Sequence, residues 1–160
     1  MVNKKNLRAI KINLTISVNV LIVLIFFNFY GLYSNQFHFK NAVNFIFPII
    51  TLVHFVYLYV LWFKISENEY PDVIMKNLEY VMYGVLVVYF YEIFETGLLL
   101  SSFTKFEGHI IPSTFLPMGI LILGLQVFLA ICTIWAFFIR KRIIGNYNFD
   151  YLNNHIDSHS

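Results

Sequence analysis

Residues 79–101, EYVMYGVLVVYFYEIFETGLLLS, limit the possible folds more than any other part of the chain. The segment is long enough and apolar enough to cross a bilayer, because a transmembrane helix needs about 20 mainly apolar residues. It nevertheless carries two carboxylates, Glu92 and Glu95, well inside it. A membrane span with two internal carboxylates is expensive, so these groups need a structural or functional explanation.

Three further apolar segments predict an all-α integral membrane protein. Only 12% of the residues are charged, whereas soluble domains average about 25%, so too little polar surface remains to coat a water-soluble globule. We predict one four-span membrane domain over residues 1–160, with short loops that favour an antiparallel helical bundle. The predicted spans are residues 12–30, 45–63, 80–100 and 115–139, followed by a polar tail at 140–160.

The loop before the third span contains Pro71, which predicts a break in any continuous helix. Val73, Ile74 and Leu78 are spaced for a short amphipathic helix that leads into the span. The first apolar segment is longer than the core of a signal peptide and lacks a small-residue cleavage site after it, so we expect an uncleaved span.

The distribution of Lys and Arg predicts the orientation. Of the 11 such residues, only Lys40 and Lys105 lie in the first and third loops. All others flank the spans at the N-terminal head, the middle loop or the start of the tail. Cytoplasmic loops carry the excess of positive charge, so both termini are predicted to be cytoplasmic, in the cytoplasmic (inner) membrane. The Arg140-Lys141-Arg142 cluster is interpreted as part of this signal.

Each predicted span has a polar residue near its middle: Asn19, His54, Glu92 and Gln126. Helical spacing and small or polar residues predict the inward faces. The faces are Thr51, His54, Leu58 and Leu61 on the second span, Gly84, Val88, Glu92, Glu95 and Leu99 on the third, and Gly119, Gln126, Ala130 and Thr133 on the fourth. The first span has two competing polar faces. One carries Thr15 and Asn19, and the other carries Asn13, Ser17, Leu24 and Asn28.

The carboxylates allow two interpretations. Two groups this close cannot easily both ionise at low dielectric, which suits a proton or cation site formed by Glu92, Glu95 and His54. Tyr57, Tyr89 or Tyr91 would then supply hydrogen bonds. Alternatively, a protonated Glu bonds to Asn19, Gln126 or His54 and holds the helices together, or Glu95 lies near the outer interface.

Metal and cofactor chemistry has little support in the sequence. No HxxxH or HExxH pattern is present, and His54 has no second histidine within the spans. His155, Asp157 and His159 in the polar tail are interpreted as solvated, and a pairing of His38 with His109 is a minor alternative. Cys132 is expected to be a small core residue. We predict no metal and no cofactor.

Function is predicted only at the level of class. We expect a non-enzymatic multi-pass protein that acts by association, as an accessory, regulatory, immunity or defence subunit with a membrane-protein partner or as a homo-oligomer. The alternative is an oligomeric proton- or cation-coupled transporter or channel that uses Glu92 and Glu95. A membrane enzyme that uses His54 and the carboxylates is a third hypothesis. No nucleic-acid partner is expected.

Overall fold

The computed structural model describes residues 4–103 and 111–147 of the chain. Of the residues that the structure describes, 79% are helical. Four long helices, α1 (Lys4–Asn28), α2 (Ile46–Ser66), α3 (Val73–Ser101) and α4 (Phe115–Ile143), make up most of the described chain. Each of them is long and apolar enough to cross a membrane, so the prediction of four membrane-spanning segments is confirmed at this level.

The turn between α2 and α3 explains why α3 begins at Val73, earlier than the predicted span. Asp72 caps the helix, because its carboxylate accepts a hydrogen bond of 2.7 Å from the backbone N–H of Met75. Lys64 closes the turn with ion pairs to Glu69 at 2.6 Å and to Asp72 at 2.9 Å. The expected short amphipathic helix is therefore the first part of α3 and continues into the span without a break.

The cap also perturbs the titration of Asp72. Burial alone would raise the pKa of the Asp72 carboxyl. The hydrogen bonds from the Met75 N–H and from Lys64 favour the charged carboxylate, and together they outweigh the effect of burial. The pKa of Asp72 therefore lies below its usual value.

The connection between α1 and α2 is more ordered than the sequence indicates. Two short antiparallel strands, β1 (Tyr30–Gly31) and β2 (Gln36–Phe37), pair Tyr30 with Phe37. A 3-10 helix (Ala42–Phe45) then leads into α2. The Asn28 amide donates to the backbone carbonyl of Asn44, which ties the end of α1 to the start of α2.

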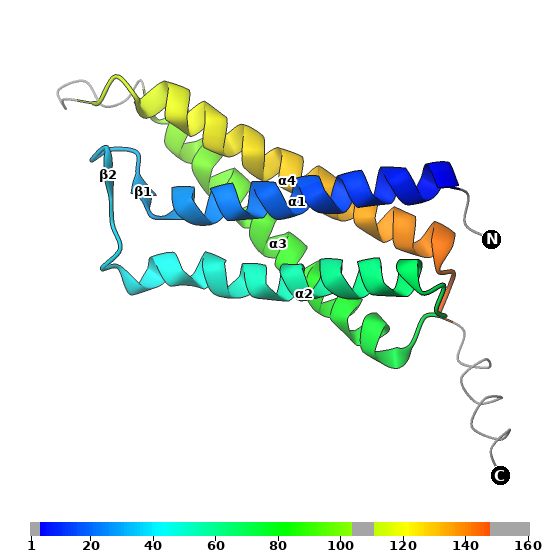
Figure 1. The fold of residues 1–160 in the computed structure, drawn as a ribbon. Helices are drawn as coiled ribbons and strands as arrows, with labels where there is room; N and C mark the ends of the chain where they lie inside the picture. Colours follow the sequence, from blue (N-terminus) through cyan, green and yellow to red (C-terminus); the bar gives the residue numbers. More distant parts are fainter. Residues whose placement is uncertain (1–3, 104–110, 148–160) are drawn as a thin grey trace, which may run out of the picture.

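The helices contact one another in a ring of neighbours: α1 packs on α2 and α4, and α3 packs on α2 and α4. Figure 1 shows the start of α1, the α2–α3 turn and the end of α4 at one end of the molecule, and the β1–β2 hairpin at the other. The main core lies between the helices and includes large apolar side chains such as Leu21, Leu61, Met82 and Leu129.

Burial tests the predicted inward faces. The predicted faces of α2 and α4 are confirmed, since Thr51, His54, Gly119, Gln126 and the other members of both stripes are buried. On α1 the choice is resolved in favour of the face that carries Asn13, Ser17 and Leu24.

The predicted inward face of α3 is wrong by about one residue. Gly84 and Glu95 are exposed, and the buried stripe consists of Met75, Glu79, Met82, Val85 and Tyr89. α3 is apolar on nearly every side, so its hydrophobic pattern does not identify the inner face. Long Met and Tyr side chains fill the space between the helices, whereas a small residue faces outward.

Candidate functional site

Glu92 and Gln126 line one cavity of about 130 Å³. Glu92 comes from the second half of α3 and Gln126 from the middle of α4. Asn28 at the end of α1 and Thr96, one turn after Glu92, add polar groups to the wall. The structure therefore brings two of the predicted polar residues together, from different helices, at one site.

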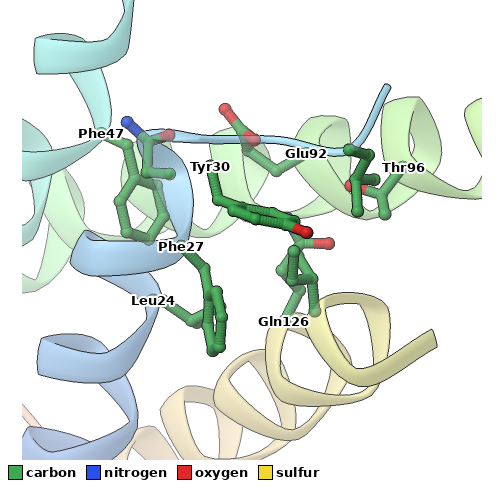
Figure 2. A pocket seen from close by; sticks show the side chains of 10 residues that line it. Leu24, Phe27, Tyr30, Phe47, Glu92, Thr96 and Gln126 are labelled. Atoms are coloured by element: carbon green, nitrogen blue, oxygen red, sulfur yellow. The ribbon is translucent and has the colours of Figure 1, made fainter. Parts of the chain in front are cut away.

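The remaining wall of this cavity is apolar and aromatic. It consists of Leu24, Phe27, Tyr30, Leu32, Phe47 and Ile122. Figure 2 shows the Tyr30 ring between Glu92 and Gln126. The Tyr30 hydroxyl donates to the Asn35 side chain, so the hairpin holds this ring over the cavity. The hairpin is thus part of the site, although sequence patterns gave no reason to include it.

Glu92 and Glu95 also line a second and larger hollow of about 580 Å³ between α2 and α3. Val43 and Asn44 in the 3-10 helix and Ile46 at the start of α2 form its other side. Glu92 is half-buried, whereas Glu95 is exposed. The two carboxylates therefore differ in environment: Glu92 borders the interior, and Glu95 belongs to the outer surface of α3.

His54 does not join the carboxylates. Its side chain is fully buried on α2, and its Nδ1 lies 2.9 Å from the hydroxyl of Tyr89 on α3. Its Nε2 has no hydrogen-bond partner among the described residues. Of the three tyrosines considered as partners, Tyr89 is bonded to His54, while Tyr91 is exposed. The hypothesis of one site formed by His54, Glu92 and Glu95 is not supported by this arrangement.

Asn19 lies on the outer face of α1. Its side-chain amide donates to the carbonyl of Thr15, one turn earlier, at 2.8 Å. This local bond satisfies part of the amide in an apolar environment. Asn19 is therefore not part of the cavity that holds Glu92 and Gln126.

Sequence analysis missed a buried ion pair at the other end of α3. Arg140 Nη2 on α4 lies 2.5 Å from Glu79 Oε1 on α3, and both side chains are almost fully buried. The Tyr147 hydroxyl donates to Glu79 Oε2 at 2.7 Å, and the Tyr83 hydroxyl donates to Oε1 at 2.9 Å. The sequence interpretation treats Arg140 with Lys141 and Arg142 mainly as an orientation signal, and this grouping gives no reason to expect that Arg140 is buried in an ion pair.

Tyr147 fastens the segment after α4 onto this pair. Its ring lies under the Arg140 guanidinium, 4.4 Å from ring centre to Cζ. Burial is the main cause that raises the pKa of the Tyr147 hydroxyl, and the hydrogen bond to Glu79 raises it further. Arg140 also donates to the Gly145 carbonyl at 2.9 Å. The pair and its tyrosines join α3, α4 and the following turn.

Residues 4–103 and 111–147 contain no group of three or more His, Cys, Asp or Glu side chains placed to hold a metal ion. His38 lies 2.6 Å from the Ser34 hydroxyl in the hairpin. His109 and the tail residues His155, Asp157 and His159 lie outside the described residues. Cys132 is a buried free cysteine, as expected.

No protein-family model, curated protein or solved structure matches this chain.

Proposed function

We propose that this protein is a multi-pass component of the cytoplasmic membrane that acts by associating with another membrane protein. It serves as an accessory or regulatory subunit, a class that includes immunity and defence proteins. In this proposal the four helices form an antiparallel bundle with both termini in the cytoplasm. The orientation rests on the excess of Lys and Arg at the helix ends that Figure 1 places together.

The observation that carries the proposal is the outer face of α3. Only 11% of its most apolar stretch is buried within the chain, compared with 33% for α1 and α2 and 39% for α4. Its exposed large side chains include five aromatic residues, together with aliphatic ones such as Val81, Val87 and Leu98; the aromatic residues are Tyr80, Tyr83, Phe90, Tyr91 and Phe94. Aromatic side chains are enriched at protein interfaces because they contribute a large contact area at little entropic cost.

Glu95 lies exposed on this same apolar face. It precedes the end of α3 by six residues, or about 9 Å along the helix axis. A carboxylate within the hydrocarbon region costs about 2.5 kcal/mol or more unless it finds a hydrogen-bond donor or water. No hydrogen bond or ion pair to Glu95 is present within the described parts of the chain. A donor supplied by a partner helix would satisfy it.

Charge favours a different protein over a second copy on this face. A symmetric contact through α3 would bring two Glu95 carboxylates toward each other, and like charges at low dielectric repel. A partner helix with Lys, Arg or a hydroxyl at this depth would instead be complementary. We therefore commit to a heterologous membrane-protein partner, with a homo-oligomer as the competing outcome.

The experiment is purification from the native host in mild detergent, for the wild type and for Glu95→Leu. We expect a stoichiometric membrane-protein partner with the wild type, and association about five- to thirtyfold weaker with the variant. An interhelical hydrogen bond is worth about 1–2 kcal/mol and 1.4 kcal/mol corresponds to a factor of ten. Glu67→Gln, which neutralises an exposed carboxylate in the α2–α3 turn, is the control and should keep the partner.

The proposal fails if the isolated wild-type protein carries out a complete reaction or flux alone, or if the partner is retained fully by Glu95→Leu. A transport role is the second candidate, favoured by the cavity that Glu92 shares with Gln126. Four helices would need an oligomer to enclose a path. In that case proton or cation flux into liposomes should disappear in Glu92→Gln while the protein still folds.

A further inference from the structure

We propose that the cavity lined by Glu92 and Gln126 binds a small protonated amine, such as ammonium or methylammonium. This inference does not depend on the association proposed above, because the cavity lies between the helices of one chain. It rests on four observations: one carboxylate, one buried carbonyl without a partner, an aromatic wall and a small volume.

The charge of the cavity favours a single positive charge. Glu92 is its one ionisable carboxylate, and no Lys, Arg or His is among the residues that line it. No hydrogen bond or ion pair to Glu92 occurs within residues 4–103 and 111–147. A monovalent cation would neutralise the carboxylate and supply the missing interaction.

Gln126 provides the second recognition group. Its side chain is 8% exposed, and its Oε1 has no hydrogen-bond partner among the described residues. A buried carbonyl without a donor costs about 1–3 kcal/mol. An ammonium group carries only donors, so one bound in this cavity would supply a donor to Gln126 Oε1 and a counter-charge to Glu92. A neutral hydroxyl or amide ligand could not also balance the carboxylate charge.

The aromatic wall and the volume define the class of cation. Phe27, Tyr30 and Phe47 line the cavity, and aromatic rings attract ammonium groups while tolerating attached methyl groups. A volume of about 130 Å³ suits a ligand of a few heavy atoms, because an apolar cavity of about 150 Å³ holds benzene. A divalent metal would keep an unbalanced positive charge beside the single glutamate.

The experiment measures binding of methylammonium chloride to the purified full-length protein in nanodiscs. Isothermal titration calorimetry is run at constant ionic strength, with sodium chloride, potassium chloride and choline chloride as competing probes. We expect saturable binding of methylammonium, and weaker binding of choline, whose quaternary nitrogen has no N–H to donate to Gln126 Oε1. Glu92→Gln and Gln126→Leu should each weaken binding at least tenfold.

Glu95→Gln is the matched control, because Glu95 lies one turn from Glu92 but does not line this cavity. It should retain saturable binding of methylammonium, because the substitution removes no group that lines the cavity. Fluorescence of Trp62 and Trp135 verifies that each variant is folded. The proposal is overturned if the folded wild type shows no saturable binding, if sodium or potassium binds as tightly, or if Glu95→Gln weakens binding as much as Glu92→Gln.

Discussion

Breaking the Glu79–Arg140 pair should destabilise the protein far more than removing an exposed charge. Glu79→Met leaves the Arg140 guanidinium buried without its counter-charge, and Arg140→Met leaves the Glu79 carboxylate buried without its counter-charge. Removing one partner of a buried pair costs about 3–5 kcal/mol, because the remaining charge stays desolvated. We expect each variant to lose about this much free energy of unfolding.

Replacing both residues by Met should cost much less than the sum of the single changes. No unpaired charge then remains, and apolar side chains fill the space between α3 and α4. The hydroxyls of Tyr83 and Tyr147 lose their acceptor, which adds about 0.5–1.5 kcal/mol for each hydrogen bond. The double-mutant cycle should therefore give a coupling energy of about 3 kcal/mol or more.

The assay is reversible unfolding in mixed micelles with increasing denaturing detergent, followed by tryptophan fluorescence. Glu67→Gln is the control, because Glu67 is exposed in the turn and its neutralisation should change stability by less than about 0.5 kcal/mol. A coupling energy below about 1 kcal/mol would refute the reasoning, since that value is typical of an exposed ion pair.

Three further perturbations test the fold and its contacts. Asp72→Ala should cost about 1 kcal/mol of unfolding free energy through loss of the α3 cap. Because the pKa of Asp72 is depressed in the folded state, the cap contributes fully above the unfolded-state pKa, and its contribution should disappear as the pH falls through the folded-state pKa. Unfolding measured from pH 7 to pH 2 tests this. Tyr89→Phe should cost about 1–3 kcal/mol by leaving His54 without a hydrogen bond on either ring nitrogen, and an unchanged unfolding midpoint would contradict the contact. Gly119→Val should cost about 1–3 kcal/mol, because its added Cβ would collide with a side chain of α3, whereas Gly124→Val, with open space around its Cα, should be nearly neutral in the same assay.

The number of spans and two of the helix faces follow from the sequence for simple reasons. Long apolar segments and their flanking charges are local features. On α2 and α4, small and polar residues form one stripe against apolar residues elsewhere, so the buried side can be identified. Thr51, His54, Gln126 and Thr133 are all buried as that pattern predicts.

Contacts between helices were not predictable from the same information. On α3 nearly every position is apolar, so two helix faces that differ by one residue look equally suitable for burial. The sequence interpretation therefore places Glu95 on the inward face, whereas the structure exposes it. The Glu79–Arg140 pair joins residues 61 positions apart, and only packing of α3 on α4 reveals it. The Tyr30 ring reaches the Glu92 cavity because a short hairpin follows α1, and periodicity does not predict that hairpin.

The most direct test of association through α3 is site-specific photo-crosslinking in the native host. A photoreactive phenylalanine replaces Phe94 on α3 or, as a control, Phe26 on α1; these residues are 64% and 63% exposed, and α1 packs mainly on α2 and α4. The account predicts one defined crosslink to a different membrane protein from position 94, lost in Glu95→Leu, and none from position 26. A crosslink to the same partner only from position 26, or from position 94 only to a second copy of the chain, would contradict it.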